Sequence, residues 1–473
     1  MNLMNKKYNY LAKNTIVFAI GSFGTKFLSF FLVPLYTNIL STEEYGVADL
    51  ITTTATLLIF VFSLNICDGV LRYVLERKTE HDEILAYGIK VLLGGSFLLS
   101  VLLIFFYLLK LVNWPLIYFF FVFLSFFSTA LYQILTNYLR AIDKAWDVAI
   151  AGIVSTVVII SCNIIFLLLI KTGIYGYIVS LIAGPAVASV YALIRTKVSL
   201  VKLFNSRLDK ETKVDIVRYC LPLIFNNSAL WINAFLDKYF VTFFCGVDQN
   251  GIYAISYKIP TILSTCFVVF SQAWSLSAVK EFDKDDREGF FSETYTVYGA
   301  LISFVTTILI IFNIPLAHFL YAKDFFEAWK YSSILIISSM FNAYTIYLGS
   351  IFTAVKRTKI IAITTVISAG CNIILNIILI PRFEVYGAAM ATLASYFVMW
   401  LVRLVFSKRY ISFSANFGKT ILVFVLLVVQ VLVEHTEKHG YMLQMVLCAM
   451  VILCYSKQVV HIVQYVRNTL RKR

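Results

Sequence analysis

The sequence predicts an all-α polytopic membrane protein, and three observations support this fold class. Of the 473 residues, 60% are hydrophobic and only 14% are charged, and the mean hydropathy is +0.83. This charged fraction is too small for the surface of a soluble protein of that size. Apolar runs of about 20 residues recur between short charged loops, which is the length that a helix needs to cross a bilayer. A membrane barrel would show shorter, alternating segments.

Each apolar run between charged or turn-rich breaks is predicted to form one spanning helix, which gives fourteen spans in all. They cover residues 15–40, 47–70, 88–109, 115–139, 148–170, 174–194, 219–245, 252–279, 294–313, 331–355, 360–380, 386–406, 419–433 and 441–463. The thirteenth is the shortest, and its loss would move the C-terminus to the other side of the membrane.

The basic residues predict the orientation, because cytoplasmic loops carry an excess of Lys and Arg. With the N-terminus inside, 27 of the 40 basic residues fall in the even-numbered connections and the termini, 6 in the other loops and 7 within spans. We therefore expect both termini in the cytoplasm. The net charge of +14 then reflects loops that face anionic lipid, and we expect no binding of nucleic acid.

The sequence gives no sign of an enzyme, a metal site or a cofactor. Its eight cysteines are scattered singly, with no CxxC pair, so we expect neither disulfides nor zinc. It contains no GxxxxGK[ST] phosphate loop and no Ser/His/Asp set. A membrane-embedded polymerase or ligase would carry a large outer loop with catalytic residues, whereas all outer loops here are short.

An internal repeat divides the chain into halves. The run Cys162-Asn163-Ile164-Ile165 with its following Gly176 recurs about 210 residues later as Cys371-Asn372-Ile373-Ile374 with Gly387. Each half then holds six helices, and because six is even, both halves enter the membrane from the same side. Such halves are related by an axis along the membrane normal and can rock against each other in alternating access. A purely structural duplication is the alternative.

This repeat predicts four parts of the chain. We expect an N-lobe at residues 1–200, a basic cytoplasmic loop at 201–218 and a C-lobe at 219–410. Residues 411–473 then hold two further helices and a basic cytoplasmic tail.

Charged residues inside the spans are the best candidates for function, since each costs about 2.5–3.5 kcal/mol to insert and usually faces water or a partner. Six of them lie in the first two helices of either half, which would line one cavity. They are Lys26, Asp49, Asp68, Asp237, Lys238 and Lys258.

Three of these residues are candidate cavity cations. Lys26 lies deep in the first span, whereas Lys258 is only about two helical turns from an outer loop, where snorkelling explains it equally well. Lys238 and Asp237 are adjacent and point about 100° apart, so that Asp237 could face Lys26. A surplus of lysine favours an anionic solute such as a phosphate.

Two further pairs have structural alternatives. Asp68 and Arg72 are four residues apart near the cytoplasmic end of the second span, where a structural ion pair is favoured over a role in the cavity. Trp231 and Trp274 are candidates for stacking against sugars, although most of the aromatic residues are expected in helix packing or the interfacial belt.

Seven short motifs occur in order along residues 8–408. They are Leu40-Ser41-Thr42-Glu43-Glu44-Tyr45-Gly46, Asp68-Gly69-Val70-Leu71-Arg72-Tyr73, Leu139-Arg140-Ala141 with Lys144, Leu221-Pro222-Leu223, Asp237-Lys238-Tyr239, Gly251-Ile252-Tyr253-Ala254 to Tyr257-Lys258-Ile259-Pro260, and Ser271-Gln272-Ala273-Trp274. Each motif is weak alone, but together they resemble the Wzx-type polysaccharide flippases of the multidrug/oligosaccharidyl-lipid/polysaccharide (MOP) exporter superfamily. The last two helices match in hydropathy only.

The resemblance implies a fold like that of the MATE transporters and a location in the bacterial inner membrane. It also implies the transport of undecaprenyl-diphosphate-linked oligosaccharide repeat units, with a proton or sodium gradient as the possible driving force. Membrane lipid, a polysaccharide polymerase and chain-length machinery are the expected partners. Lys26, Lys238 and Lys258 would attract the pyrophosphate, and Asp49 and Asp237 would set their charge state or couple to an ion.

The sequence departs from the family's pattern twice and leaves other cargoes open. Lys238 stands where an arginine is common, which keeps the charge but loses bidentate phosphate binding, and Leu276 replaces a usual proline. A multidrug cation antiporter of the same superfamily would need an acidic cavity, which the lysines oppose. A lipid II flippase shares the pyrophosphate chemistry, and charge alone does not separate it from a polysaccharide flippase.

Overall fold

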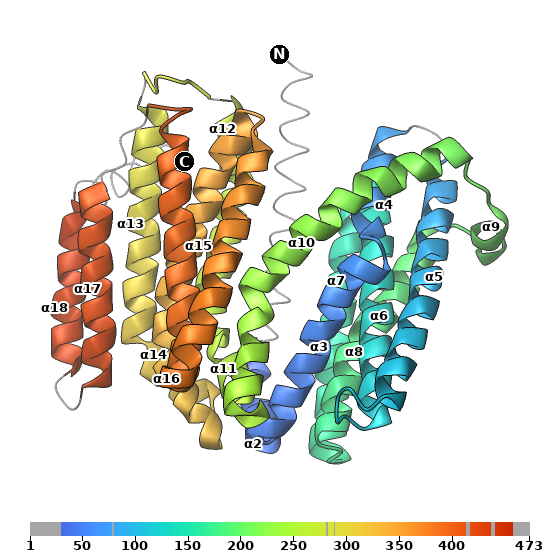
Figure 1. The fold of residues 1–473 in the computed structure, drawn as a ribbon, viewed down its shortest axis with the longest axis horizontal. Helices are drawn as coiled ribbons and strands as arrows, with labels where there is room; N and C mark the ends of the chain where they lie inside the picture. Colours follow the sequence, from blue (N-terminus) through green and yellow to red (C-terminus); the bar gives the residue numbers. More distant parts are fainter. Residues whose placement is uncertain are drawn as a thin grey trace, which may run out of the picture. The chain divides into compact units, whose positions relative to one another are not determined.

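The computed structural model describes residues 30–77, 80–280, 282–287, 289–412, 417–436 and 440–456, and these residues form helices and their connections without strands (Figure 1). The all-α polytopic class is therefore confirmed. The chain forms two compact units, of which the first ends at Trp231 and the second begins at Ile232.

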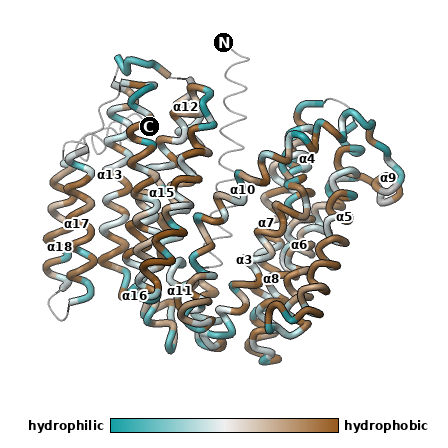
Figure 2. Tube along the Cα trace, viewed as in Figure 1, coloured by the Kyte–Doolittle hydropathy of each residue, from teal (hydrophilic) through white to brown (hydrophobic). Residues whose placement is uncertain are grey.

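By length and composition, ten helical stretches of the described residues could cross a membrane, and Figure 2 shows long hydrophobic stretches in helices such as α5 and α6. One of the ten, α16 (Thr358–Ser407), contains two predicted spans, which meet at Glu384, where a φ of 50° interrupts the helix. The predicted seventh and fourteenth spans correspond to α10 (Lys210–Cys245) and to the shorter α18 (Gly440–Cys454). Most of the first span lies outside the described residues.

The first unit is built around one central helix. Its elements are α2 (Val33–Ile39), α3 (Thr42–Phe62), α4 (Ile66–Glu76), α5 (His81–Leu108), α6 (Leu116–Ala141), α7 (Ala145–Asn163) with the π-helix η1 (Ile164–Leu169), α8 (Ile174–Thr196), α9 (Leu200–Asn205) and the first part of α10. The central helix is α6, which packs against α3, α4, α5, α7 and α8.

The predicted second span is interrupted towards its C-terminal end. A capping box starts it, in which the Ser41 side chain accepts from the Glu44 N–H and Glu44 accepts from the Ser41 N–H. The helix stops at residues 63–65, where Leu64 and Asn65 have φ values of 52° and 51°, and resumes as α4. A left-handed backbone conformation is unusual for residues other than glycine, and here it separates α3 from α4.

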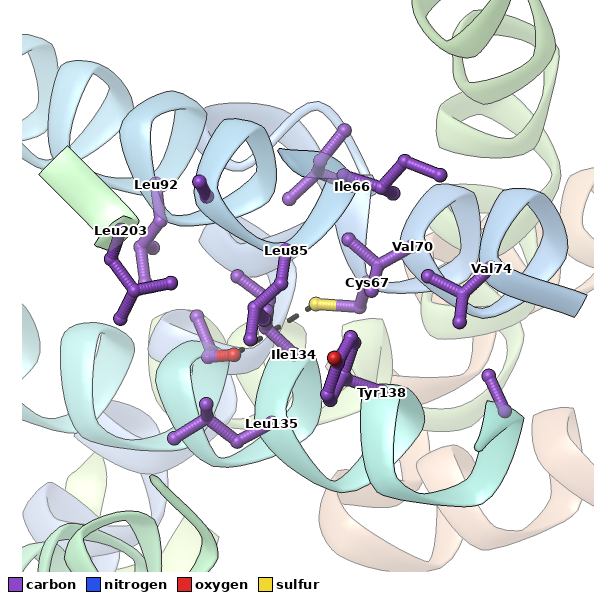
Figure 3. Packing of buried hydrophobic residues seen from close by; sticks show 14 of the residues in the cluster. Ile66, Cys67, Val70, Val74, Leu85, Leu92, Ile134, Leu135, Tyr138 and Leu203 are labelled. Carbon is purple, nitrogen blue, oxygen red and sulfur yellow. Dashed lines mark hydrogen bonds between the residues drawn. The ribbon is translucent and has the colours of Figure 1, made fainter. Parts of the chain in front are cut away.

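The apolar core of this unit explains where the unit ends. Cys67 and Val70 of α4 pack with Leu85 of α5 and Ile134 of α6 in the cluster shown in Figure 3. The same cluster includes Ile216 and Cys220 of α10. The first half of α10 thus belongs to the first unit, and the boundary falls inside this helix instead of in the predicted loop at 201–218.

The second unit is also built around one central helix, α15 (Trp329–Ala354). It contains the rest of α10, α11 (Val247–Ser256), α12 (Lys258–Lys280), α13 (Phe290–Ile311), α14 (Asn313–Leu320), η2 (Lys323–Ala328), α15, α16, α17 (Phe417–His435) and α18. Here α15 packs against α11, α12, α13, α14, α16 and α17. Because α6 and α15 are the fourth helices of the two predicted halves, their equal role agrees with the internal repeat.

Candidate functional site

Asp237 lies at the centre of a buried hydroxyl cage in the second unit. Its carboxylate is on α10, and the residue is 1% exposed. One oxygen accepts hydrogen bonds from the hydroxyls of Tyr257 at 2.9 Å and Thr392 at 2.9 Å, and also from that of Tyr253. The donors come from α11, from the junction between α11 and α12, and from α16. Three side chains thus converge on one carboxylate, which is how a buried charge is kept in a protein.

Lys238 lies beside this cage and is 6% exposed. Its ammonium is 5.3 Å from the centre of the Phe235 ring and 5.9 Å from that of Tyr257. It also interacts electrostatically with Asp237. Tyr257 therefore contacts both charges, since its hydroxyl binds Asp237 and its ring lies near the ammonium. The structure brings these two predicted residues together in one unit.

The other predicted cations are placed differently. Lys258 is half-buried at the first position of α12, directly after Tyr257, where the predicted eighth helix is interrupted. Lys26 lies outside the described residues, so its position relative to Asp237 stays a prediction.

Asp49 belongs to an aromatic cluster of the first unit. It is half-buried on α3 and interacts electrostatically with Tyr45 and Tyr177. The rings of Tyr36 and Tyr45 are stacked with centres 5.4 Å apart, and Tyr177 lies 5.3 Å from Tyr36. This carboxylate thus has tyrosines around it, as Asp237 does in the second unit.

The predicted ion pair between Asp68 and Arg72 is wrong. Arg72 Nε lies 3.3 Å from a carboxylate oxygen of Glu76, and both side chains are more than half exposed. Asp68 instead accepts a hydrogen bond from Asn65 Nδ2 at 2.8 Å and interacts electrostatically with Arg140. The reason is the break before α4, because Asn65 in its left-handed conformation lies where it can reach Asp68.

Neither tryptophan proposed for sugar stacking presents an open ring in this structure. Trp231 is 4% exposed, and its indole N–H donates to the Thr53 carbonyl at 3.2 Å. Trp274 is 3% exposed and stacks on Tyr347 with ring centres 4.3 Å apart. Its N–H donates to the Tyr347 carbonyl at 3.1 Å. Both indoles are packing residues here, because burial covers the faces that a sugar would need.

Arg403 is a buried cation that was not among the predicted site residues, and it is 5% exposed in the last turns of α16. Its guanidinium has only neutral acceptors in the described structure, which are the Thr345 carbonyl at 2.7 Å, the Thr364 hydroxyl at 3.0 Å, the Thr365 hydroxyl at 3.1 Å and the Ile361 carbonyl at 3.4 Å. The Thr365 carbonyl in turn accepts from Asn233 Nδ2 at 2.9 Å, one helical turn before Asp237 on α10. The position of Arg403 inside the predicted twelfth span is the feature of the sequence that could have identified it.

We expect Arg403→Leu to destabilise the protein by about 1–3 kcal/mol, because the buried oxygens that it satisfies would lose their donor. Thermal unfolding of the purified protein in detergent measures the effect. Arg403→Lys should fall between the wild type and the leucine variant, since lysine keeps the charge but lacks the planar fork. As a control, Arg72→Leu removes only an exposed pair and should leave the midpoint unchanged. Equal midpoints for the leucine variants would contradict the role given to Arg403.

The arrangement of helices identifies the class of protein. The fold resembles that of the lipid II flippase MurJ in its inward closed conformation, with a TM-score of 0.72 at 18% identity over 95% of this chain and 99% of that one. It also resembles an inward-facing multidrug resistance MATE transporter of the MOP superfamily, with a TM-score of 0.62 at 13% identity over 84% of this chain and 100% of that one. The chain thus shares the fold of these two proteins, and its spanning helices make it a multi-pass membrane protein.

The family follows from the sequence. The model of the polysaccharide biosynthesis protein family matches residues 11–275, which is more than half of the chain. The MatE family model matches residues 222–378. No curated protein matches the sequence. The chain belongs to the polysaccharide biosynthesis protein family, as the motifs quoted above predict.

Proposed function

We propose that this transporter is a Wzx-type flippase that moves undecaprenyl-diphosphate-linked oligosaccharide repeat units across the bacterial inner membrane, for the synthesis of a surface polysaccharide. The observation that carries the proposal is the match to the polysaccharide biosynthesis family over residues 11–275. Alternating access of the two repeated halves would move the headgroup, while the prenyl chain stays in the lipid.

The charges support an anionic cargo. Lys238 is held by aromatic rings within an apolar unit, where a cation attracts a diphosphate more strongly than it would in water. In the proposal, Lys26 and Lys258 extend this positive field. Asp237 balances Lys238 and, together with Asp49, is a candidate for coupling to a proton or sodium gradient. A polysaccharide polymerase and chain-length proteins would receive the product.

Translocation in proteoliposomes tests the cargo directly. The purified protein is reconstituted with fluorescent undecaprenyl-diphosphate oligosaccharide, with lipid II or with a cationic dye, and the label that crosses the bilayer is measured. We expect movement of the oligosaccharide-linked lipid. Faster movement of lipid II would favour the peptidoglycan precursor as cargo, and transport of the dye alone would favour the multidrug antiporter.

We expect Lys26→Ala to abolish export of surface polysaccharide in cells that depend on this protein, while membrane insertion stays intact. The reason is that the substitution removes a cation deep in the first span without changing an apolar packing face. Lys258→Ala is the comparison, and it should have a smaller effect because snorkelling also explains that lysine. Immunoblots of membranes control for the amount of protein, and wild-type polysaccharide levels in Lys26→Ala would count against the assignment.

A further inference from the structure

Glu434, in the last turn of α17, is a buried carboxyl group outside the candidate site. The residue is 7% exposed. One of its oxygens accepts a hydrogen bond from Asn313 Nδ2 at 2.8 Å. Asn313 is itself fully buried, and the same nitrogen also donates to the Trp329 carbonyl at 2.9 Å. Both N–H bonds of this amide are therefore used.

Several polar atoms at this place have no hydrogen-bond partner among the described residues. They include the second carboxyl oxygen of Glu434, Asn313 Oδ1 and His435 Nε2. The hydroxyl of Ser333, which is also fully buried, lies beside the carboxyl group. Two unpartnered oxygens in one buried place call for a hydrogen-bond donor or a positive charge.

The charged groups on the surrounding helices do not supply that charge. Lys330 at the start of α15 is paired with Glu327 of η2 at 3.0 Å. His435 lies with its ring 5.0 Å from that of Trp329, and its Nδ1 is 2.8 Å from the Val431 carbonyl. On α14, His318 packs on Phe326 of η2 with ring centres 4.4 Å apart. On α16, Arg382 and Glu384 are exposed, and α18 has no charged residue.

We propose that Glu434 is a proton-binding site that attaches the C-terminal helices α17 and α18 to the rest of the second unit. With a proton on its second oxygen, the group is neutral and offers a donor to its surroundings. When the proton leaves to solvent, the buried charge is desolvated without a cation to balance it, and this cost destabilises the attachment of α17. The attachment of the C-terminal hairpin would then depend on pH.

A second contact of α17, one turn earlier, provides the comparison. Thr307 Oγ1 of α13 donates to Gln430 Oε1 at 2.8 Å, and Gln430 Nε2 donates to the Thr307 carbonyl at 3.1 Å. Thr307 and Gln430 are both fully buried, and neither side chain can titrate. The same face of α17 thus carries one anchor that is insensitive to pH and one that is sensitive. Because both helices lie outside the six-helix repeat, the proposal does not rest on the cargo.

The test uses the full-length protein in lipid nanodiscs and two measurements. Infrared spectroscopy at about pH 7, where an ordinary glutamate is ionised, should show a protonated-carboxyl band that is lost in Glu434→Gln. The thermal unfolding midpoint of the wild type should fall as the pH rises, because ionisation would leave a charge buried in the folded state without a cation to balance it. Glu434→Gln, which mimics the neutral group, should lose most of that fall.

Two control variants separate the explanations. Gln430→Leu should lower the midpoint at every pH and keep the slope of the wild type, and His435→Gln should also keep that slope. Loss of the pH dependence in His435→Gln, with retention in Glu434→Gln, would overturn the proposal. A wild-type midpoint that rises with sodium chloride at fixed ionic strength, but not in Glu434→Gln, would show a metal cation in place of the proton and would also overturn it.

Discussion

Asp237→Asn is expected to reduce transport at least about tenfold while the protein still folds and inserts. The carboxylate accepts from Tyr257, Thr392 and Tyr253 and lies beside the buried Lys238. Asparagine keeps the size of the side chain but removes the charge that offsets this lysine, and it turns one acceptor into a donor that faces hydroxyl groups. Translocation in proteoliposomes, normalised to reconstituted protein, measures the effect.

Asp68→Asn is the matched control, because it makes the same chemical change at another charged residue of the spans. Asp68 is half-buried, and its hydrogen-bond partners are amide groups that an asparagine can also engage. We therefore expect a much smaller loss. The charge-reversing Asp237→Lys should likewise impair transport more than Asp68→Asn. If Asp68→Asn is the more damaging change, Asp237 is not the centre of the site.

Gly95→Ala is expected to give the largest loss of stability. Gly95 on α5 lies against the break between α3 and α4, and a Cβ atom there would be only 1.8 Å from the Phe62 carbonyl oxygen. Backbone cannot move aside as a side chain can, so either α5 must move away or the break must change. Overpacking of this kind costs about 1–3 kcal/mol where side chains can adjust, and more where they cannot. The thermal unfolding midpoint and the yield of monodisperse protein measure the loss.

The neighbouring glycine provides the control. Around Gly94, a Cβ atom would meet nothing within 4 Å. Gly94→Ala should therefore be neutral or slightly stabilising, because alanine favours the helix. Equal yields and midpoints for the two variants would show that α5 does not approach the break as closely as the structure has it.

The spans were predictable because the bilayer imposes a simple rule on the sequence. A helix that crosses it needs about 20 apolar residues, and such runs are visible without knowledge of their partners. The break at Leu64 and Asn65 was not visible in this way. Neither residue is a glycine or a proline, and the apolar run continues through the break. The contact with Gly95 on another helix supports it, and no local pattern shows such a contact.

The candidate site was predictable in part for the same reason. Asp237 and Lys238 stand out because charges are rare in spans. The residues around Asp237 do not stand out, since Tyr253 is one of 29 tyrosines and Thr392 lies 155 positions away. For Asp68 the local pattern was misleading. Its helical spacing to Arg72 suggested an ion pair, but the break before α4 places Asn65 where it donates a hydrogen bond to Asp68.

The amino-acid sequence by itself determined that this protein is a bundle of membrane helices with an internal duplication and a few buried charges, because the cost of placing polar groups in lipid acts on every residue separately. Tertiary structure alone decided which side chains surround those charges, that α10 is shared by both units, and that Glu434 meets Asn313. Such contacts depend on helices that are distant in sequence, and hydrogen bonds between them form only once the chain has folded.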